Sequence, residues 1–361
     1  MLLWDGYGLQ STHSGIGRHA LELAQNLTAL GTPPHILPSV PQLDFTFQPW
    51  TVPLKPFSMG RIKPLALFAA GRMAKRFVKG DDGPHVFHGL SNYNIPALSP
   101  AFQRVLTIHD LIPFMAPDAV SKALRTYMVL QLPRAILKAD HIICVSQWTA
   151  DSVLDLFPGA KGKISVILNG KPPLASSAVK AGEKDTINLF TLSRDETYKR
   201  LHLIPEILKK LPENYEWHVL TQGSGLDLLQ NIPRLHLHTA IADAALEQLW
   251  KNTDIFVHPS LWEGYCLPAA SALSLGIPSV YTGGSGIDEV VGSAGIRLAA
   301  SEGAAPWASA IEGVGNSLTQ WPSRCAKQWQ RLPTWAEVAG QTQKVYATLS
   351  ASLDTSKESV R

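Results

Sequence analysis

Strand-like and helix-like segments alternate along the whole chain, and this alternation constrains the fold more than any other feature. Short apolar runs, such as residues 2–4 and 104–108, are each followed by a segment whose apolar residues have helical spacing. Such alternation favours parallel sheets with helices on both faces. With 361 residues, the chain is long enough for two α/β domains, each with its own core.

The most informative segment runs from residue 254 to 280. Residues 254–258 read Asp-Ile-Phe-Val-His, which is typical of a buried strand, and a tight loop with Glu263 and Gly264 follows. Pro268 suits the first turn of a helix, because its missing N–H is not needed there. A carboxylate and small residues before a helix suit a phosphate-bearing ligand, since free N–H groups and the dipole attract the anion. An ordinary strand-loop-helix unit is the alternative.

Residues 258–268, His-Pro-Ser-Leu-Trp-Glu-Gly-Tyr-Cys-Leu-Pro, resemble the donor-site signature of the retaining glycosyltransferases of family 4, which have the GT-B fold. In that family two glutamates are separated by seven residues. Glu263 matches the first, and Ser271 stands where the second is expected. Cys266 replaces the usual second glycine. The resemblance, to bacterial mannosyltransferase-like members, implies donor contacts from Glu263, Gly264, Tyr265, Cys266, Leu267 and Ser271.

Two cations follow the expected strand at residues 187–192. Arg194 and Lys199 lie five residues apart across a strand-to-helix loop, where a guanidinium fork and an ammonium can straddle a diphosphate. A solvated basic loop is the alternative. The resemblance implies that these two residues are the donor-phosphate pair, and it favours Lys199 over Arg200.

Gly15 and Gly17 lie in a turn that opens a helix near the N-terminus. The spacing superficially fits a dinucleotide fingerprint, but about ten residues separate the first strand from these glycines and no acidic residue ends the next strand. A glycine-rich turn still offers N–H groups to a phosphate, and a plain turn with positive φ is the alternative. The resemblance implies that this loop approaches the donor diphosphate.

His109 and Asp110 follow the strand at residues 104–108. Polar groups at the carboxyl end of a parallel strand lie where open α/β sheets bind ligands, although a single histidine there is often structural. The resemblance implies that His109 lies close to the donor sugar. It places Asp110 on the acceptor side or gives it the role of orienting the loop.

The segment at residues 64–79 has the pattern of an amphipathic helix. One face carries four basic residues and the other carries apolar ones. The basic face is either simply solvated or docks on an anionic membrane surface. The basic residues are Arg72, Lys75, Arg76 and Lys79, and the apolar ones are Ala66, Ala70, Met73 and Phe77.

The amino-acid composition indicates in which compartment the protein works and which kinds of partner it can have. Cysteines 144, 266 and 325 are an odd number without metal-type spacing, which argues for a reduced, cytoplasmic protein. We find no signal peptide and no apolar stretch of about 18 residues. The first 171 residues carry 16 Lys and Arg against 10 Asp and Glu, and the remainder carries 16 against 19. This asymmetry indicates an anionic surface or substrate near the first half.

The resemblance covers residues 1–349 and implies two Rossmann-like domains that face a central cleft. The expected parts are an acceptor domain at 1–171, a linker at 172–185, a nucleotide-sugar donor domain at 186–334, and a helix at 335–349 that returns to the first domain.

The implied activity is retaining transfer of a hexose, with mannose as one candidate, from a nucleotide-sugar. The acceptor would be a saccharide or a lipid-linked molecule in the synthesis of cell-surface polysaccharide or lipopolysaccharide. The sequence has no Asp-x-Asp pair, and the resemblance implies that no bound metal is needed. We also expect no cofactor, with the nucleotide-sugar as substrate, and no nucleic-acid partner. A cytoplasmic protein, peripheral on the inner membrane face if the basic helix docks there, is expected. The alternative is a non-catalytic GT-B subunit that binds a glycan or a partner glycosyltransferase. The expected catalytic residues are His109, Arg194, Lys199 and Glu263.

Overall fold

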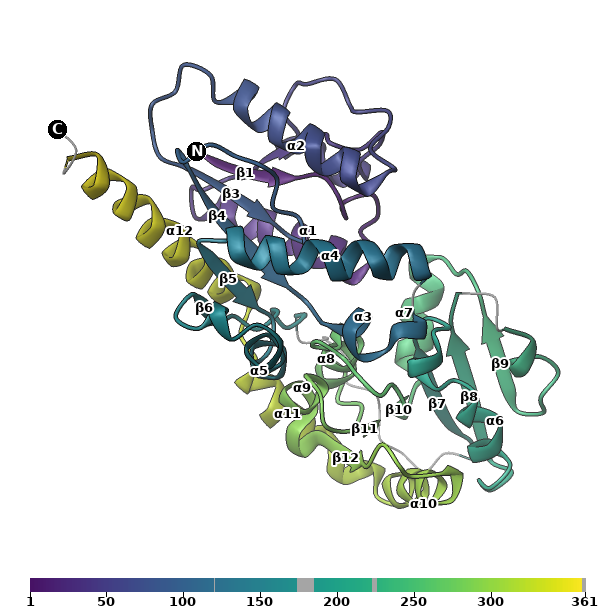
Figure 1. Cartoon of the computed structure of the whole chain (residues 1–361). Coiled ribbons are helices and arrows are strands. Elements are labelled where there is room, and N and C mark those ends of the chain that lie inside the picture. Colours follow the sequence, from purple (N-terminus) through teal and green to yellow (C-terminus); the bar gives the residue numbers. More distant parts are fainter. Residues whose placement is uncertain (120, 174–184, 223–225, 359–361) are drawn as a thin grey trace. The chain divides into compact units, whose positions relative to one another are not determined.

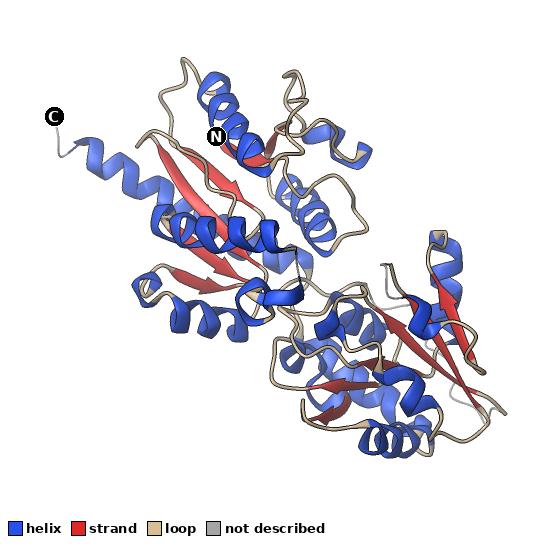
Figure 2. Ribbon diagram, turned by 45° about the vertical axis from the view of Figure 1, so that its right-hand side comes forward, coloured by secondary structure: helices blue, strands red, loops and turns tan. Residues whose placement is uncertain are grey.

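The computed structural model describes residues 1–119, 121–173, 185–222 and 226–358. They form two compact units, and each contains one six-stranded sheet. The alternation of strands and helices therefore predicted the α/β class correctly (Figures 1 and 2). The expected linker lies almost entirely outside the described residues. The first unit comprises Met1–Leu111, Ala123–Gly170 and Pro333–Arg361, and the second comprises Ile112–Lys122 and Lys171–Leu332.

The sheet of the first unit is parallel throughout. Because consecutive strands run in the same direction, the chain crosses back between most of them through helices. The strand order is β2 (His35–Leu37), β1 (Leu2–Asp5), β3 (His85–Gly89), β4 (Phe102–Ile108), β5 (His141–Cys144) and β6 (Ile164–Val166). The helical segments are α1 (Gly15–Ala29), η1 (Phe45–Trp50), α2 (Lys63–Phe77), α4 (Lys122–Lys138), α5 (Gln147–Leu156) and η3 (Pro158–Ala160).

The last helix, α12 (Trp335–Glu358), belongs to the first unit and extends beyond the predicted residue 349. It packs on α1 and against β3 and β4. Its buried residues Trp335, Val338 and Ala339 have the spacing of one helix face. The hydroxyl of buried Tyr346 lies 2.6 Å from Nδ1 of His88 on β3, so a polar contact also fixes the helix.

The sheet of the second unit is also parallel. Its order is β12 (Gly295–Leu298), β11 (Ser279–Thr282), β10 (Ile255–His258), β7 (Ile187–Leu192), β8 (Tyr215–Leu220) and β9 (Leu235–His238). The α-helices are α3 (Ile112–Met115), α6 (Leu203–Leu208), α7 (Asp243–Asn252), α8 (Leu267–Ser274), α9 (Ile287–Val291), α10 (Ala304–Gly315) and α11 (Trp321–Arg331). The short 3-10 helices are η2 (Pro117–Ala119), η4 (Thr197–Lys199), η5 (Leu226–Leu229), η6 (Gly292–Ala294) and η7 (Leu318–Gln320).

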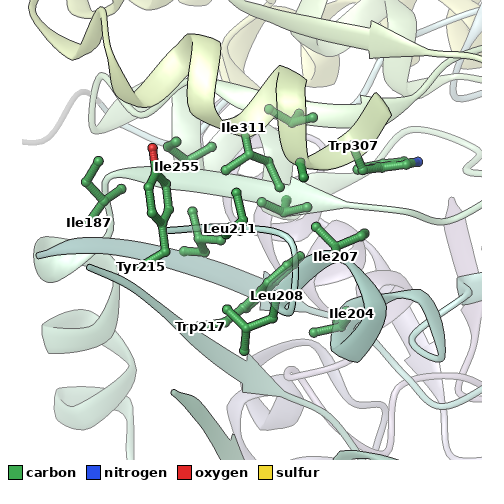
Figure 3. Close-up of a cluster of buried hydrophobic side chains, with 14 of the residues drawn as sticks. Ile187, Ile204, Ile207, Leu208, Leu211, Tyr215, Trp217, Ile255, Trp307 and Ile311 are labelled. Atoms are coloured by element: carbon green, nitrogen blue, oxygen red, sulfur yellow. The ribbon is translucent and has the colours of Figure 1, made fainter. Parts of the chain in front are cut away.

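A continuous apolar core lies between this second sheet and the helices α6 and α10 (Figure 3). Alternate residues of the strands, such as Tyr215 and Trp217, point into it, while Ile207 and Ile311 come from the helices. Burying one such aliphatic side chain stabilises the fold by about 1.5–3 kcal/mol. This core fixes β7 and β10, whose carboxyl ends carry the site described next.

Candidate functional site

Three loops follow adjacent strands of the second sheet, β7, β10 and β11, and leave its carboxyl edge. Backbone hydrogen bonds tie them together. The N–H of Leu261 donates to the carbonyl of Tyr198 over 2.9 Å, and the N–H of Gly286 donates to that of Glu263 over 2.8 Å. Side chains from all three loops are therefore held at one place, the usual ligand-binding edge of such sheets.

Lys199 and Glu263 meet at this edge. The Lys199 Nζ donates to Oε1 of Glu263 over 2.6 Å, and Nε2 of His258 lies 2.6 Å from the same oxygen. Only 12% and 13% of the Lys199 and Glu263 side chains are exposed, and His258 is buried at the end of β10. The backbone N–H of Glu263 donates to Oγ of Ser285, which further orients the carboxylate.

Mutual attraction keeps this cluster charged. Burial opposes ionisation of Glu263, but the charges and hydrogen bonds of Lys199 and His258 prevail and hold its pKa well below the usual range. Burial likewise opposes the charge on Lys199, and Glu263 reverses this and raises its pKa. For His258, burial is outweighed by Cys266 and Glu263, so its pKa is raised to about 9. A carboxylate and two cations are therefore preorganised at the sheet edge.

Arg194 does not join the cluster. Its side chain is 69% exposed, and its guanidinium lies 3.9 Å from Glu196. Arg200, by contrast, is buried and donates to the carbonyls of Ala300 and Glu302 over 2.8 and 3.1 Å. Of the two adjacent cations, Lys199 therefore contacts Glu263, whereas Arg200 stabilises the packing of the second unit.

The backbone of the acidic motif is tightly packed. A Cβ on Gly286 would clash with the carbonyl of Gly264, so only glycine fits beside this loop. Tyr265 is buried, and its hydroxyl has no hydrogen-bond partner among the described residues. Cys266 caps α8 with φ 77°, a left-handed conformation that costs a residue with a Cβ of the order of 1–3 kcal/mol. This conformation explains why glycine suits position 266.

Ser271 is the fifth residue of α8, one position beyond the first turn, because the helix begins at Leu267. Pro268 lies in that first turn, as the sequence predicted. The Ser271 hydroxyl donates to the carbonyl of Leu267 over 3.3 Å, as serines inside helices often do. Its oxygen does not contact the Lys199–Glu263 pair in the described structure.

In the first unit, Gly15 opens α1 and Gly17 lies in its first turn. The Gly17 N–H donates to the capping hydroxyl of Ser14, and a Cβ on Gly17 would clash with the carbonyl of Ser11. Neither glycine has a positive φ. Gly17 is thus required by close packing, and its N–H is already used, whereas Gly15 is exposed with open space around it.

His109 is half-buried just beyond β4. Its Nε2 lies 2.9 Å from the carbonyl of Leu90, its backbone N–H donates to Asn92, and Asn92 also donates to the carbonyl of Asp110. Burial lowers the pKa of His109 to about 4, so its imidazole is neutral near pH 7. Asn92 therefore joins the loops after β3 and β4, and both His109 and Asp110 lie on the carboxyl edge of the first sheet.

Two histidines at these sheet edges, His258 and His19, were not predicted as site residues from the sequence. His258 shares the carboxylate of Glu263, and its position as the last residue of the strand before the acidic motif was an available signal. His19 lies buried on α1, 5.0 Å from the ring of His109, with Nδ1 2.7 Å from Asn169. No sequence signal linked positions 19 and 109, because they are brought together only by the fold.

One group of three side chains among the described residues has metal-ligating character. The ligand atoms of His258, Glu263 and Cys266 lie within 4.8 Å of one another. Nε2 of His258 lies 2.6 Å from Oε1 of Glu263, the separation of a hydrogen bond, and the same oxygen accepts from Lys199. The arrangement suits an internal ion-pair cluster better than a metal centre.

Two protein-family models match this chain. Residues 13–171 match the family model "Glycosyltransferase Family 4", and residues 188–316 match "Glycosyl transferases group 1". The two matches together span most of the chain and cover the loops that carry His109, Lys199 and Glu263.

Individual relatives are distant. The O-antigen chain mannosyltransferase B of Escherichia coli is 23% identical over 328 residues, covering 78% of this chain and 82% of that protein. The O-antigen chain mannosyltransferase RfbU of Salmonella typhimurium is 22% identical over 232 residues, or 62% of this chain and 63% of that protein. One component of the human phosphatidylinositol N-acetylglucosaminyltransferase is 25% identical over 289 residues, or 73% of this chain and 58% of that protein.

Solved structures show the same fold. The sucrose-phosphate synthase of Thermosynechococcus elongatus superimposes with a TM-score of 0.77 at 16% identity, covering 97% of this chain and 99% of that chain. HepE of Anabaena, solved with UDP and glucose, has a TM-score of 0.69 at 15% identity, with 96% and 98% covered. The two parallel six-stranded sheets therefore correspond to the GT-B architecture.

Proposed function

Because the chain belongs to glycosyltransferase family 4, whose members are retaining enzymes that use a nucleotide-sugar, we propose that it transfers a hexose to a saccharide or lipid-linked acceptor. Mannose is the first candidate, and cell-surface polysaccharide the first candidate product. Two relatives support these finer assignments, since both are O-antigen chain mannosyltransferases.

The observation that carries the proposal is the Lys199–Glu263 pair at the carboxyl edge of the second sheet. Glu263 is ionised and accepts hydrogen bonds, so it suits the hydroxyls of the donor sugar. Lys199 supplies positive charge that stabilises the leaving diphosphate. Such stabilisation is strong when the cation is already in place in a partly buried site. Arg194, exposed on the same loop, is assigned as the second cation.

The chemistry assigned to these residues requires no bound metal and no covalent intermediate. As the sugar–phosphate bond breaks, the cations stabilise the charge on the departing diphosphate. The acceptor hydroxyl attacks on the same face, and the leaving phosphate takes its proton. An α-configured donor therefore gives an α-linkage. His109 is assigned to the donor sugar, and Asp110 to the acceptor side.

A panel of UDP-, ADP- and GDP-linked hexoses tests this proposal. One donor should raise the melting temperature and be hydrolysed slowly without acceptor. Failure of every nucleotide-sugar to bind or turn over would contradict the proposal, and would favour a non-catalytic subunit.

We further propose that α2 docks this protein on an anionic membrane surface. Arg72, Lys75, Arg76 and Lys79 are exposed, and Lys79 lies two residues beyond the end of α2. On the predicted apolar face, Ala66 and Ala70 are buried, and Met73 and Phe77 are partly buried. Exposed apolar side chains accompany the charges: Met59, Ile62 and Phe68 are 54%, 55% and 61% exposed. No described helix has the combined length and apolarity needed to cross a bilayer.

Vesicle co-sedimentation tests the docking. Each basic residue near the headgroups contributes about 1 kcal/mol, so replacing all four by Gln should abolish binding to vesicles rich in phosphatidylserine. The native protein should bind less as salt rises. No binding by the native protein at low ionic strength would contradict this assignment.

A further inference from the structure

The ammonium group of Lys63 lies among aromatic side chains of the first unit: the rings of Tyr7 and Tyr93 contact it, and Tyr127 packs against Tyr93. Tyr7 follows β1, Tyr93 follows β3, Tyr127 lies on α4, and Lys63 begins α2. Since β1 and β3 are adjacent parallel strands, Tyr7 and Tyr93 both lie at the carboxyl edge of the sheet. This is the edge on which His109 also lies.

The geometry is that of a lysine enclosed by phenols. The Lys63 Nζ donates to the Tyr93 hydroxyl over 2.7 Å, and it lies 5.0 and 5.3 Å from the ring centres of Tyr93 and Tyr7. Tyr127 meets Tyr93 edge to face, with ring centres 5.5 Å apart. The rings stabilise the cation through their faces. The hydroxyls of Tyr7 and Tyr93 also interact with each other.

Lys63 has no carboxylate partner within ion-pair distance among the described residues. Asp5, at the end of β1, is buried and accepts from the Tyr7 N–H and the Ser39 hydroxyl, so it fixes the Tyr7 loop. Burial lowers the pKa of Lys63 to about 8. A half-buried cation is costly unless an anion accompanies it, so the arrangement favours an anionic ligand.

Asn92 connects this cluster to His109. It lies next to Tyr93 in the loop after β3, and its side chain bonds to the backbone of both His109 and Asp110. A ligand group bound by Lys63 and Tyr93 therefore lies beside the loop after β3, which is hydrogen-bonded to His109 and Asp110.

We propose that Lys63, with Tyr7, Tyr93 and Tyr127, binds a phosphate group of the acceptor. This assignment rests on the proposed glycosyl transfer. A phosphate oxyanion accepts several hydrogen bonds at once and pairs with the ammonium, which matches one cation and several hydroxyl donors. The phosphate belongs either to a lipid-linked diphosphate or to a soluble phosphorylated saccharide. The basic face of α2, which begins at Lys63, favours the lipid-linked source.

The test is calorimetric titration of the full-length protein with geranyl diphosphate, mannose 1-phosphate and glucuronate. To keep the two donor-site cations from contributing, all proteins carry Arg194→Met and Lys199→Met. Lys63→Met should weaken binding of geranyl diphosphate about 10- to 100-fold, the loss expected for a charge-assisted contact. Lys63→Arg should restore much of it. The matched control is Lys161→Met, which removes an exposed charge from the same unit, outside α2, and should bind as its parent does.

The outcomes separate the alternatives. Preference for geranyl diphosphate supports the lipid-linked source, and preference for mannose 1-phosphate supports the soluble one. Preference for glucuronate, equal loss in the Lys63 and Lys161 variants, or no binding of any probe would overturn the proposal. These probes are not donors, so a failure here is distinct from failure of nucleotide-sugar turnover. Melting curves of each variant identify any that has simply lost its fold.

Discussion

Lys199 and Glu263 form an ion pair of 2.6 Å, although the two residues come from different loops and lie 64 positions apart. Both side chains are largely buried, and the same carboxylate oxygen also meets His258. The pair therefore contributes to the stability of the second unit as well as to the charge of the proposed donor site.

The two proposed phosphate cations should differ in their effect on stability. Lys199→Ala leaves Glu263 with only His258, so we expect a loss of about 3 kcal/mol, at the low end of the range for broken buried pairs. Arg194→Ala should change stability by less than about 0.5 kcal/mol, since the side chain is exposed. Both should lower donor turnover about 10²–10³-fold. Equal melting temperatures for the two variants would contradict the structural difference.

Position 266 should prefer glycine to alanine. Both substitutions remove the thiol, but only glycine relaxes the left-handed backbone with φ 77°. We expect Cys266→Gly to be more stable than Cys266→Ala by about 1 kcal/mol. Alanine is usually the more stabilising of the two residues, because it lowers the entropy of the unfolded chain, but not where φ is positive. Chemical denaturation of the two variants measures this difference. A more stable alanine variant would show that the backbone at 266 relaxes.

The sequence predicted the elements of the fold better than the arrangement of the site. Apolar periodicity and the loop signatures located β10, α8 and the acidic motif, because these signals are local. The Lys199–Glu263 pair and the approach of His19 to His109 join segments far apart in the chain, which no local pattern specifies. The contact of His258 with Glu263 is local, five residues along the chain, but the loop conformation that creates it was not predicted. Helix ends were also missed: α12 continues past 349, because its first turns are fixed by packing whereas its end has no stop signal.

A glutamate at position 271 tests how the donor ribose is held. Ser271 bonds only to its own helix in the described structure, so its replacement breaks no contact between elements. We expect Ser271→Glu to bind the cognate nucleoside diphosphate several-fold to about 100-fold more tightly, because a charged acceptor near the ribose hydroxyls is restored. Ser271→Gln, with the same shape and no charge, is the control. Weaker binding by the glutamate variant would indicate a pocket reshaped around serine.

The buried histidines of the first unit should make the protein labile to acid. Burial lowers the pKa of His109 to about 4 and that of His19 to about 3. A histidine with a depressed pKa contributes stability that is complete above its unfolded pKa of about 6.5 and is lost as the pH falls towards the folded value. For His109 this amounts to about 2 kcal/mol between pH 7 and pH 5. His109→Gln should therefore lose less stability than the native protein over this range. Identical pH profiles of the melting temperature would refute this.

The most direct test of the donor site is release of the nucleoside diphosphate from whichever nucleotide-sugar the native protein accepts. Native protein and Glu263→Gln are compared with Glu206→Gln, which removes an equal charge from an exposed pair with Lys209 on the same unit. We predict a loss of at least about 100-fold for Glu263→Gln and a native rate for the control. A Glu263→Gln variant that folds normally and releases the nucleotide at the native rate would contradict the assignment of this carboxylate to the donor sugar.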